Sequence, residues 1–142
     1  MKFRIAAAVL LFADLLVGFW ATIVPRSFYD DFPGGGQRWI AADGPFNEHL
    51  LRDVGALNLA VGVLALGAIL RPRRFGRMAG AAHLVWTGLH LGYHATHLSM
   101  LSTGAGALEV AALTVPVLAA LFLVFFSPPD DVPLIDIGPS TA

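Results

Sequence analysis

Four histidines recur in one apolar stretch of the chain, where ionisable side chains are costly. His83, His90, His94 and His97 all fall within the segment Phe75–Met100. At about 100° per residue, the last three lie within roughly 60° of one another on a helix. Their i,i+4 and i,i+3 spacings let two imidazoles reach one metal ion from the same helix face. The stripe therefore predicts a site that binds a transition metal or handles protons.

Carboxylates occur at matching depths in the neighbouring apolar segments. His49 and Asp53 form an i,i+4 pair near the start of the second segment, and Glu109 lies near the start of the fourth. At about 1.5 Å per residue, all three should lie at the depth of the last histidines. Glu109 is predicted to be a further ligand or the catalytic base. The predicted metal ligands are His49, Asp53, His90, His94 and His97.

Asp14 and His83 lie deeper than this cluster. Asp14 is near the middle of the first segment, at a depth closest to His90. It either belongs to the site or is a packing anchor that bonds Asn58 or a histidine. His83 lies two turns from the other histidines, and a lone membrane histidine most often makes an interhelical hydrogen bond. We expect that role for His83.

Three interpretations of the cluster remain open. Imidazole suits zinc, copper and iron, so the first is a zinc, iron or copper ion. Such an ion would activate water or oxygen, or handle electrons, on a lipophilic small molecule. The second is a non-enzymatic accessory subunit whose polar cluster is structural. The third, which we rank lower, is haem held by His49 and either His90 or His94.

The composition identifies the environment of this site. The chain is 56% hydrophobic and only 13% charged, whereas soluble domains carry about 25% charged residues. A net charge of -1 gives no indication of nucleic-acid binding. The absence of cysteine from the sequence excludes disulfides, thiolate metal sites and iron–sulfur clusters. Because so apolar a chain could not cover itself with a polar surface in water, the predicted partner is the lipid bilayer.

Four apolar segments are each long enough to cross a bilayer, which requires about 20 residues. They predict an all-α fold, a four-helix transmembrane bundle, in a single domain over residues 1–127. The first segment is expected to be a retained helix rather than a signal peptide, because it is long and contains Asp14. The tail 128–142 is Pro-rich and acidic, and we expect it to be disordered. The segments are roughly Phe3–Val24, Phe46–Leu70, Phe75–Met100 and Gly106–Phe126.

The loop 25–45 between the first two segments is too apolar for a free linker. We expect its aromatic side chains to pack on the mouth of the bundle as a partial lid. They are Phe28, Tyr29, Phe32 and Trp39.

Two stretches resemble a known group of membrane proteins. Residues 47–64 read Asn-Glu-His-Leu-Leu-Arg-Asp-Val-Gly-Ala-Leu-Asn-Leu-Ala-Val-Gly-Val-Leu, and residues 25–29 read Pro-Arg-Ser-Phe-Tyr. Both are similar to small DoxX-like four-helix membrane proteins. The resemblance covers the first half of the chain, and it implies a membrane redox or accessory role without assigning any residue.

Basic residues cluster on one side of the predicted membrane, which the positive-inside rule assigns to the cytoplasm. This predicts a multi-pass protein of the cell membrane with both termini cytoplasmic and the loop 25–45 outside. Homo-oligomerisation or assembly into a larger membrane complex stays open. The basic residues are Lys2, Arg4, Arg71, Arg73, Arg74 and Arg77.

Thiol labelling tests this topology directly, because the chain has no cysteine of its own. In intact cells, a Gly35→Cys variant should react with an impermeant thiol reagent, since residue 35 lies in the outer loop. An Arg73→Cys variant should react only after the cells are lysed. The reverse pattern would invert the topology.

Overall fold

The computed structural model describes residues 1–129, and within them all regular structure is helical. Most of the predicted tail, from residue 130 onward, lies outside the described residues. The all-α prediction is confirmed. The long helices are α1 (Lys2–Ile23), α4 (Glu48–Leu70), α5 (Pro72–Thr96) and α6 (Thr103–Phe126), and the short ones are α2 (Pro25–Asp31), α3 (Trp39–Asp43) and the 3₁₀ helix η1 (Leu98–Met100).

Three of these helices, α1, α4 and α6, are long and apolar enough to cross a membrane. Large apolar side chains lie exposed along them, as at Phe12, Val63 and Leu118. Such surfaces suit lipid rather than water, and the chain is therefore a candidate membrane protein. Four spans were predicted, but among residues 1–129 α5 does not meet the same criterion of composition, although it has 25 residues.

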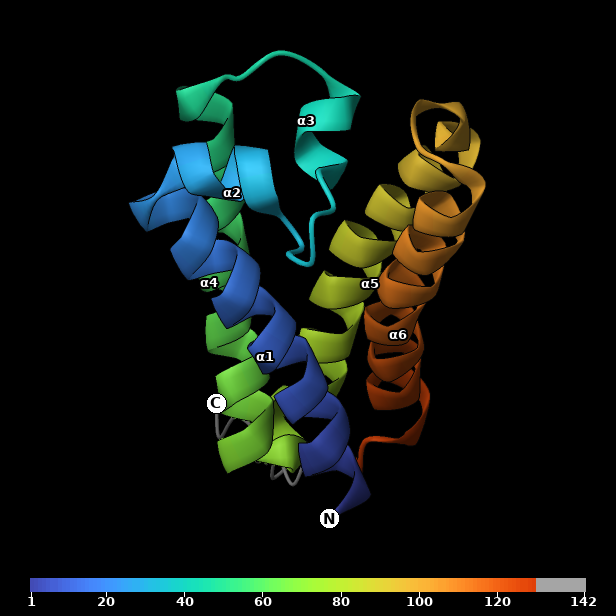
Figure 1. Cartoon of the computed structure of the whole chain (residues 1–142). Coiled ribbons are helices and arrows are strands. Elements are labelled where there is room, and N and C mark those ends of the chain that lie inside the picture. Colours follow the sequence, from blue (N-terminus) through green and yellow to red (C-terminus); the bar gives the residue numbers. More distant parts are fainter. Residues whose placement is uncertain (130–142) are drawn as a thin grey trace, which may run out of the picture.

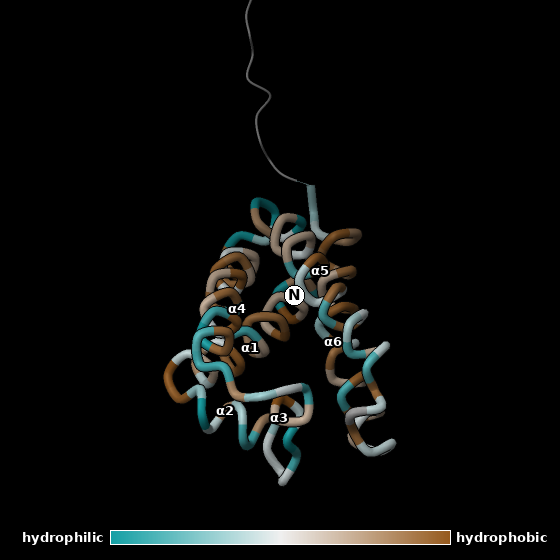
Figure 2. The backbone as a smooth tube through the Cα atoms, turned by 90° about the horizontal axis from the view of Figure 1, so that it is seen from above, coloured by the Kyte–Doolittle hydropathy of each residue, from teal (hydrophilic) through white to brown (hydrophobic). Residues whose placement is uncertain are grey.

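The long helices form two antiparallel pairs, α1 with α4 and α5 with α6. Figure 1 shows both pairs close together at the end that carries the N-terminus. At the opposite end, α2 lies beside α1 and α4, and α3 lies between the two pairs. We call this opposite end the cap end. Figure 2, a view along the bundle, shows α2 and α3 together on one side of it.

Local sequence signals account for where these helices begin. Pro25 and Pro72 occupy the first turns of α2 and α5, where a missing backbone N–H costs nothing. The side chains of Asn47 and Ser102 cap α4 and α6, because each accepts a hydrogen bond from the backbone N–H three residues later. The short connections between α4 and α5 and between α5 and α6 make these neighbouring helices run antiparallel.

Small residues form the apolar core at the end opposite the cap. Helices that associate in lipid gain little from the hydrophobic effect and depend on close packing, which small side chains permit. A second apolar cluster, formed by Ala21, Phe28 and Leu51, lies on α1, α2 and α4 at the cap end. In the part of the chain that is described, no apolar cluster joins the two pairs at the cap end. The first cluster contains Ala7, Leu10, Ala65, Ala68, Ala79, Ala120 and Leu123.

Gly80 shows how tightly α5 packs on α6. A Cβ added there would lie 2.8 Å from both the Ala120 carbonyl oxygen and the Val124 amide nitrogen. These are backbone atoms, so the helices themselves would have to separate. Gly92, on the same helix, has nothing within 4 Å of an added Cβ.

Alanine at these two glycines should therefore have opposite effects on stability. Overpacking should lower the free energy of unfolding of Gly80→Ala by about 1–3 kcal/mol. Gly92→Ala should leave it unchanged or raise it by about 0.5–1 kcal/mol, because glycine is unfavourable inside a helix. Reversible unfolding in detergent micelles measures both values, and equal stabilities would contradict the close approach of α5 and α6.

Candidate functional site

A buried histidine–carboxylate pair joins the two helix pairs midway along the bundle. His83 Nε2 on α5 lies 2.8 Å from Asp14 Oδ2 on α1, and both side chains are buried. The other ring nitrogen, Nδ1, lies 2.7 Å from the carbonyl oxygen of Ala79. A carbonyl only accepts, so Nδ1 carries a hydrogen and donates it. The short contact to Asp14 must then hold one further proton, and the pair shares it with no net charge.

Asp14 and His83 meet because they lie at similar distances from the starts of α1 and α5, which begin at the same end of the bundle. Asp14 is twelve residues from the start of α1 and His83 eleven from the start of α5, or about 18 and 16.5 Å at 1.5 Å per residue. The predicted interhelical bond of His83 is thus confirmed. The match of Asp14 with the depth of His90 is wrong, because it assumed that α5 runs from 75 to 100. Gly62 of α4 leaves room beside the Asp14 side chain.

A second histidine–carboxylate pair lies nearer the cap end, between α5 and α6. His94 Nδ1 lies 3.1 Å from Glu109 Oε1, with side chains 14% and 5% exposed. The two residues border a cavity of about 10 Å³, which has room for roughly one water molecule. The other residues that line it are Trp39, Ala42, Asp43, His97 and Leu101.

Helix α3 closes this cavity from the side of the cap. Asp43 Oδ1 accepts a hydrogen bond of 3.1 Å from the Tyr93 hydroxyl of α5. Trp39 is only 7% exposed, and its indole Nε1–H has no acceptor among the described residues. A buried donor without a partner loses its hydration with nothing in return. Trp39, which lines the cavity, therefore carries an unsatisfied buried donor.

The remaining histidines of the α5 stripe make ring contacts rather than a shared site. The His90 ring stacks on Trp86, with centroids 5.4 Å apart, and meets the His94 ring edge-on at 4.6 Å. The His97 ring stacks on Tyr93 at 4.1 Å, and its Nδ1 lies 2.8 Å from the carbonyl oxygen of that residue. His97 also lines the cavity.

The structure places His49 and Asp53 apart from this cluster. They contact each other at 3.3 Å and are 89% and 63% exposed. The buried face of α4, with Leu51, Gly55 and Asn58, lies on the other side of the helix. No ion pair or hydrogen bond joins His49 or Asp53 to the α5 histidines within residues 1–129. In the same range, no three histidine or carboxylate side chains are grouped so as to hold one metal ion.

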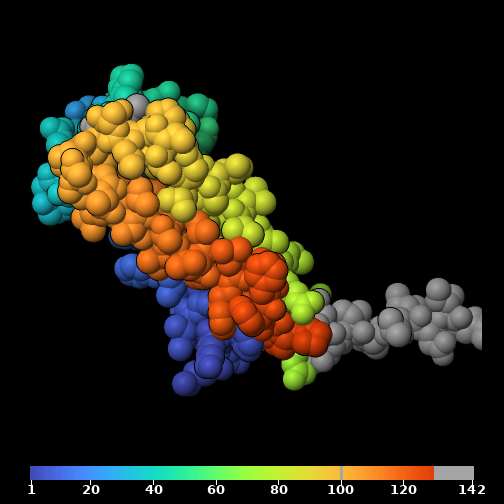
Figure 3. Space-filling view, turned by 90° about the vertical axis from the view of Figure 1, so that its right-hand side faces the viewer, coloured from blue at the N-terminus to red at the C-terminus, as the bar shows by residue number. Residues whose placement is uncertain are grey.

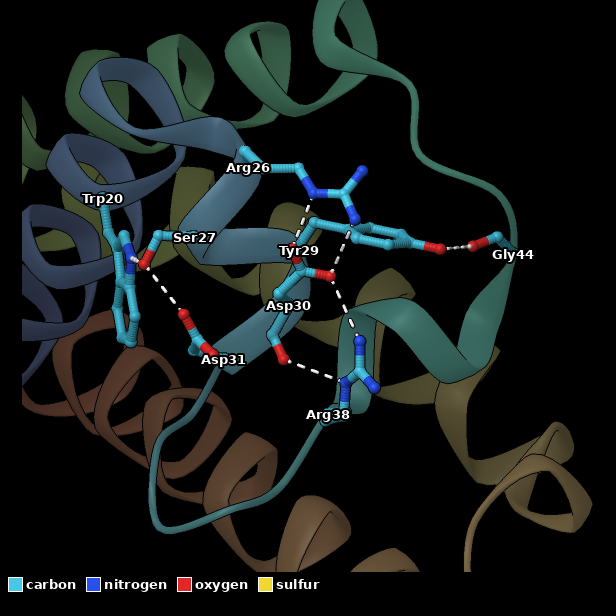
Figure 4. Close-up of polar contacts among 8 residues, drawn as sticks. All are labelled: Trp20, Arg26, Ser27, Tyr29, Asp30, Asp31, Arg38 and Gly44. Atoms are coloured by element: carbon cyan, nitrogen blue, oxygen red, sulfur yellow. Dashed lines mark hydrogen bonds and ion pairs between the residues drawn. The ribbon is translucent and has the colours of Figure 1, made fainter.

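An ion cluster fixes the segment that carries α3. Asp30 accepts hydrogen bonds from Arg26 Nε at 2.6 Å and from a terminal nitrogen of Arg38 at 3.1 Å (Figure 4). The Arg26 guanidinium holds the pKa of the Asp30 carboxyl below its ordinary value, and Arg38 adds to the effect. Arg38 also donates to the Asp30 carbonyl oxygen. Asp30 thereby ties the start of α3 to the end of α2.

Further contacts order the rest of the predicted lid. The Tyr29 hydroxyl donates to the Gly44 carbonyl oxygen at 2.7 Å, which spans the segment between them (Figure 4). The rings of Phe28, Phe32 and Trp39 pack in sequence. Phe28 and Trp39 are buried, so the expectation that the loop packs on the bundle is confirmed.

Two cavity residues, Trp39 and Asp43, were missed as site residues from the sequence. Their signal is a short stretch, Trp-Ile-Ala-Ala-Asp, between the glycines at 34–36 and Gly44. An i,i+4 spacing places both on one face of a single helical turn. Searches against family models, curated proteins and solved structures find no match. The DoxX-like resemblance therefore stays a prediction, and function has to be argued from the site.

The Asp14–His83 pair makes a clear prediction about stability. His83→Leu leaves an unpaired buried carboxyl group and should cost about 3–5 kcal/mol of unfolding free energy. The double variant Asp14→Leu/His83→Leu removes both polar groups, so it should recover much of that loss. Unfolding of both single variants and the double variant in micelles completes the cycle. Additive losses would show that the two side chains act independently.

Proposed function

We propose that the protein is a multi-pass protein of the cell membrane in which α5 is the fourth span. Both termini would be cytoplasmic and the cap end would face outward, as the basic residues favour. The exposures along α5 support this. Its most exposed positions include the apolar Val85 and Leu89, at 65% and 74%, whereas His83 and His94 face protein. A helix of this kind keeps its polar groups away from lipid, because hydrocarbon offers them no hydrogen-bond partner.

We propose that the outward-facing His94–Glu109 site exchanges a proton with a water-sized ligand in the cavity under the cap. The observation that carries this is the direct contact of two side chains that are only 14% and 5% exposed. An isolated carboxylate or imidazolium is costly there, so the pair is best stabilised when it shares one proton. A water molecule in the adjoining cavity could give a proton to this pair or take it. Glu109 is the proposed acid–base group.

The alternatives fit the geometry less well. A metal ion could bind between His94 and Glu109 only if their contact opened, because the two side chains now contact each other directly. Haem held across α4 and α5 would need His49 to face the bundle, but that side chain is exposed on α4. A purely structural role suits the enclosed Asp14–His83 pair better than a pair that borders a cavity.

Infrared difference spectroscopy in lipid nanodiscs tests the proton-exchange role. Wild-type protein should show a protonated-carboxyl band that appears and disappears with pH, because Glu109 gains and loses a proton. Glu109→Gln should remove this band. Glu48→Gln is the matched control and should retain it, since Glu48 is exposed and pairs with Arg52.

Two results would overturn the proposal. One is a band that persists unchanged in Glu109→Gln. The other is a stoichiometric metal, found by elemental analysis, that is lost in His94→Ala and kept in His49→Ala. That second result would replace proton exchange with metal binding at the same site.

A further inference from the structure

Basic side chains gather at the end of the bundle opposite the cap. Figure 3 shows the starts of α1 (blue) and α5 (yellow-green) and the end of α6 (red) at this end of the molecule. Exposed lysine and arginine side chains lie at or next to the two helix starts. Within residues 1–129, every acidic residue lies either near mid-bundle, as Asp14 does, or toward the cap end. We call this surface the basic end, and its residues are Lys2, Arg4, Arg71, Arg73, Arg74 and Arg77.

The charges of the basic end are not balanced in the way that those of the cap end are. No carboxylate of residues 1–129 forms an ion pair with the basic end. Arg74 and Arg77 lie about 60° apart on α5 at 100° per residue, and like charges at this spacing repel each other. At the cap end, in contrast, each arginine contacts a carboxylate, in the pairs Arg26–Asp30, Arg38–Asp30 and Arg52–Glu48.

The helix starts at the basic end also lack caps. Asn47 and Ser102 cap α4 and α6, which begin at the cap end, but no side chain caps α1 or α5. The first turn of a helix carries partial positive charge, because its backbone N–H groups have no partner within the helix. Neither α1 nor α5 has an acidic residue in its first turn. An anion bound at the basic end would therefore be stabilised both by the basic side chains and by the helix starts.

Large apolar side chains lie exposed next to these charges. The three helices that can cross a membrane all have an end here, since α1 begins and α4 and α6 end at this side. In a bilayer the basic end would then lie at the depth of the lipid head groups. A ligand that carries a phosphate next to acyl chains fits both the charged and the apolar surface, whereas free phosphate fits only the first. The exposed apolar residues are Ile5, Leu70, Met78, Phe125 and Phe126.

We propose that the basic end binds an anionic phospholipid of the phosphatidylglycerol class. Its phosphate group contacts Arg74 and Arg77 near the uncapped start of α5, and its acyl chains cover the apolar side chains beside them. Clusters of roughly four to eight basic residues next to a membrane helix typically attract anionic lipids. This inference rests on the proposed membrane location, and it is independent of proton exchange at His94 and Glu109.

Native mass spectrometry of the full-length protein in detergent micelles tests the proposal. The probes are palmitoyl-oleoyl phosphatidylglycerol and the zwitterionic phosphatidylcholine with the same chains, and wild-type protein should bind the first more tightly. Arg74→Gln/Arg77→Gln should weaken phosphatidylglycerol binding by roughly fivefold for each charge removed and leave phosphatidylcholine binding unchanged. Arg74→Lys/Arg77→Lys keeps both charges and should retain most of the preference. Arg26→Gln/Arg52→Gln, the matched control, removes the same charge from the cap end and should bind as wild type.

Three results with these lipids would contradict the proposal. Equal affinities of wild-type protein for the two lipids would show that the basic end holds only ordinary boundary lipid. Unchanged phosphatidylglycerol binding in Arg74→Gln/Arg77→Gln, at an unchanged melting temperature, would place the lipid elsewhere. Displacement of phosphatidylglycerol by an equal concentration of inorganic phosphate would indicate a site for soluble anions.

The acidic residues of the tail, which lie outside the described residues, are a rival occupant of the basic end. A lipid preference that appears only in Asp130→Asn/Asp131→Asn/Asp136→Asn would show that the tail, and not lipid, occupies this surface in the native chain. Thiol labelling separates this inference from the membrane location on which it rests. If the lipid preference fails while Gly35→Cys and Arg73→Cys label as predicted, the location stands and only lipid recognition is wrong.

Discussion

The contact between Asp14 and His83 fixes how the two helix pairs can be arranged. Either side chain alone would be a costly polar group in an apolar interior, so α1 and α5 must present them at one level and toward each other. The Ala79 carbonyl sets the orientation of the His83 ring, and Gly62 leaves space for Asp14. This pair therefore sets both the axial position and the rotation of α5 against α1. The same rotation determines the direction in which every other side chain on the α5 stripe points.

On either side of this level the bundle is built differently. Toward the N-terminal end, alanines and leucines from all four long helices form one core, and Gly80 brings α5 against the backbone of α6. Toward the cap end, the apolar packing joins α2 and α3 to the α1–α4 pair and does not extend to α5 or α6. The space that remains between the pairs is occupied by α3 and by polar side chains, among them His94 and Glu109. The rigid end thus holds the helices in register, and the polar end is free to carry a site.

The sequence predicts how far along its helix each residue lies, but not the direction in which the helix turns that residue. Segment lengths and the 3.6-residue period identify the four long helices and the histidine stripe, and the aromatic loop identifies the lid. Depth alone does not give rotation, which is why His49 and Asp53 were placed in the site. The small residues Gly55 and Gly62 mark the buried face of α4, and Asp53 lies about 160° from Gly55 at 100° per residue. The positions of Trp39 and Asp43 depend on tertiary contacts such as Arg38 with Asp30, which no local pattern specifies.

The weak apolar character of α5 and the existence of the site share a cause. The histidines lower the hydropathy of this helix, and they are the same groups that contact Asp14 and Glu109. A helix with these side chains is tolerated in a bilayer only if other helices satisfy them, because lipid offers no partner. Membrane insertion of α5 should therefore depend on α1 and α6 being present to pair with it. If α5 spans the membrane, as proposed, a change that removes those partners should remove both the site and the span. The polar stripe would then be the feature least suited to a membrane helix and also the one that holds α5 in the bundle.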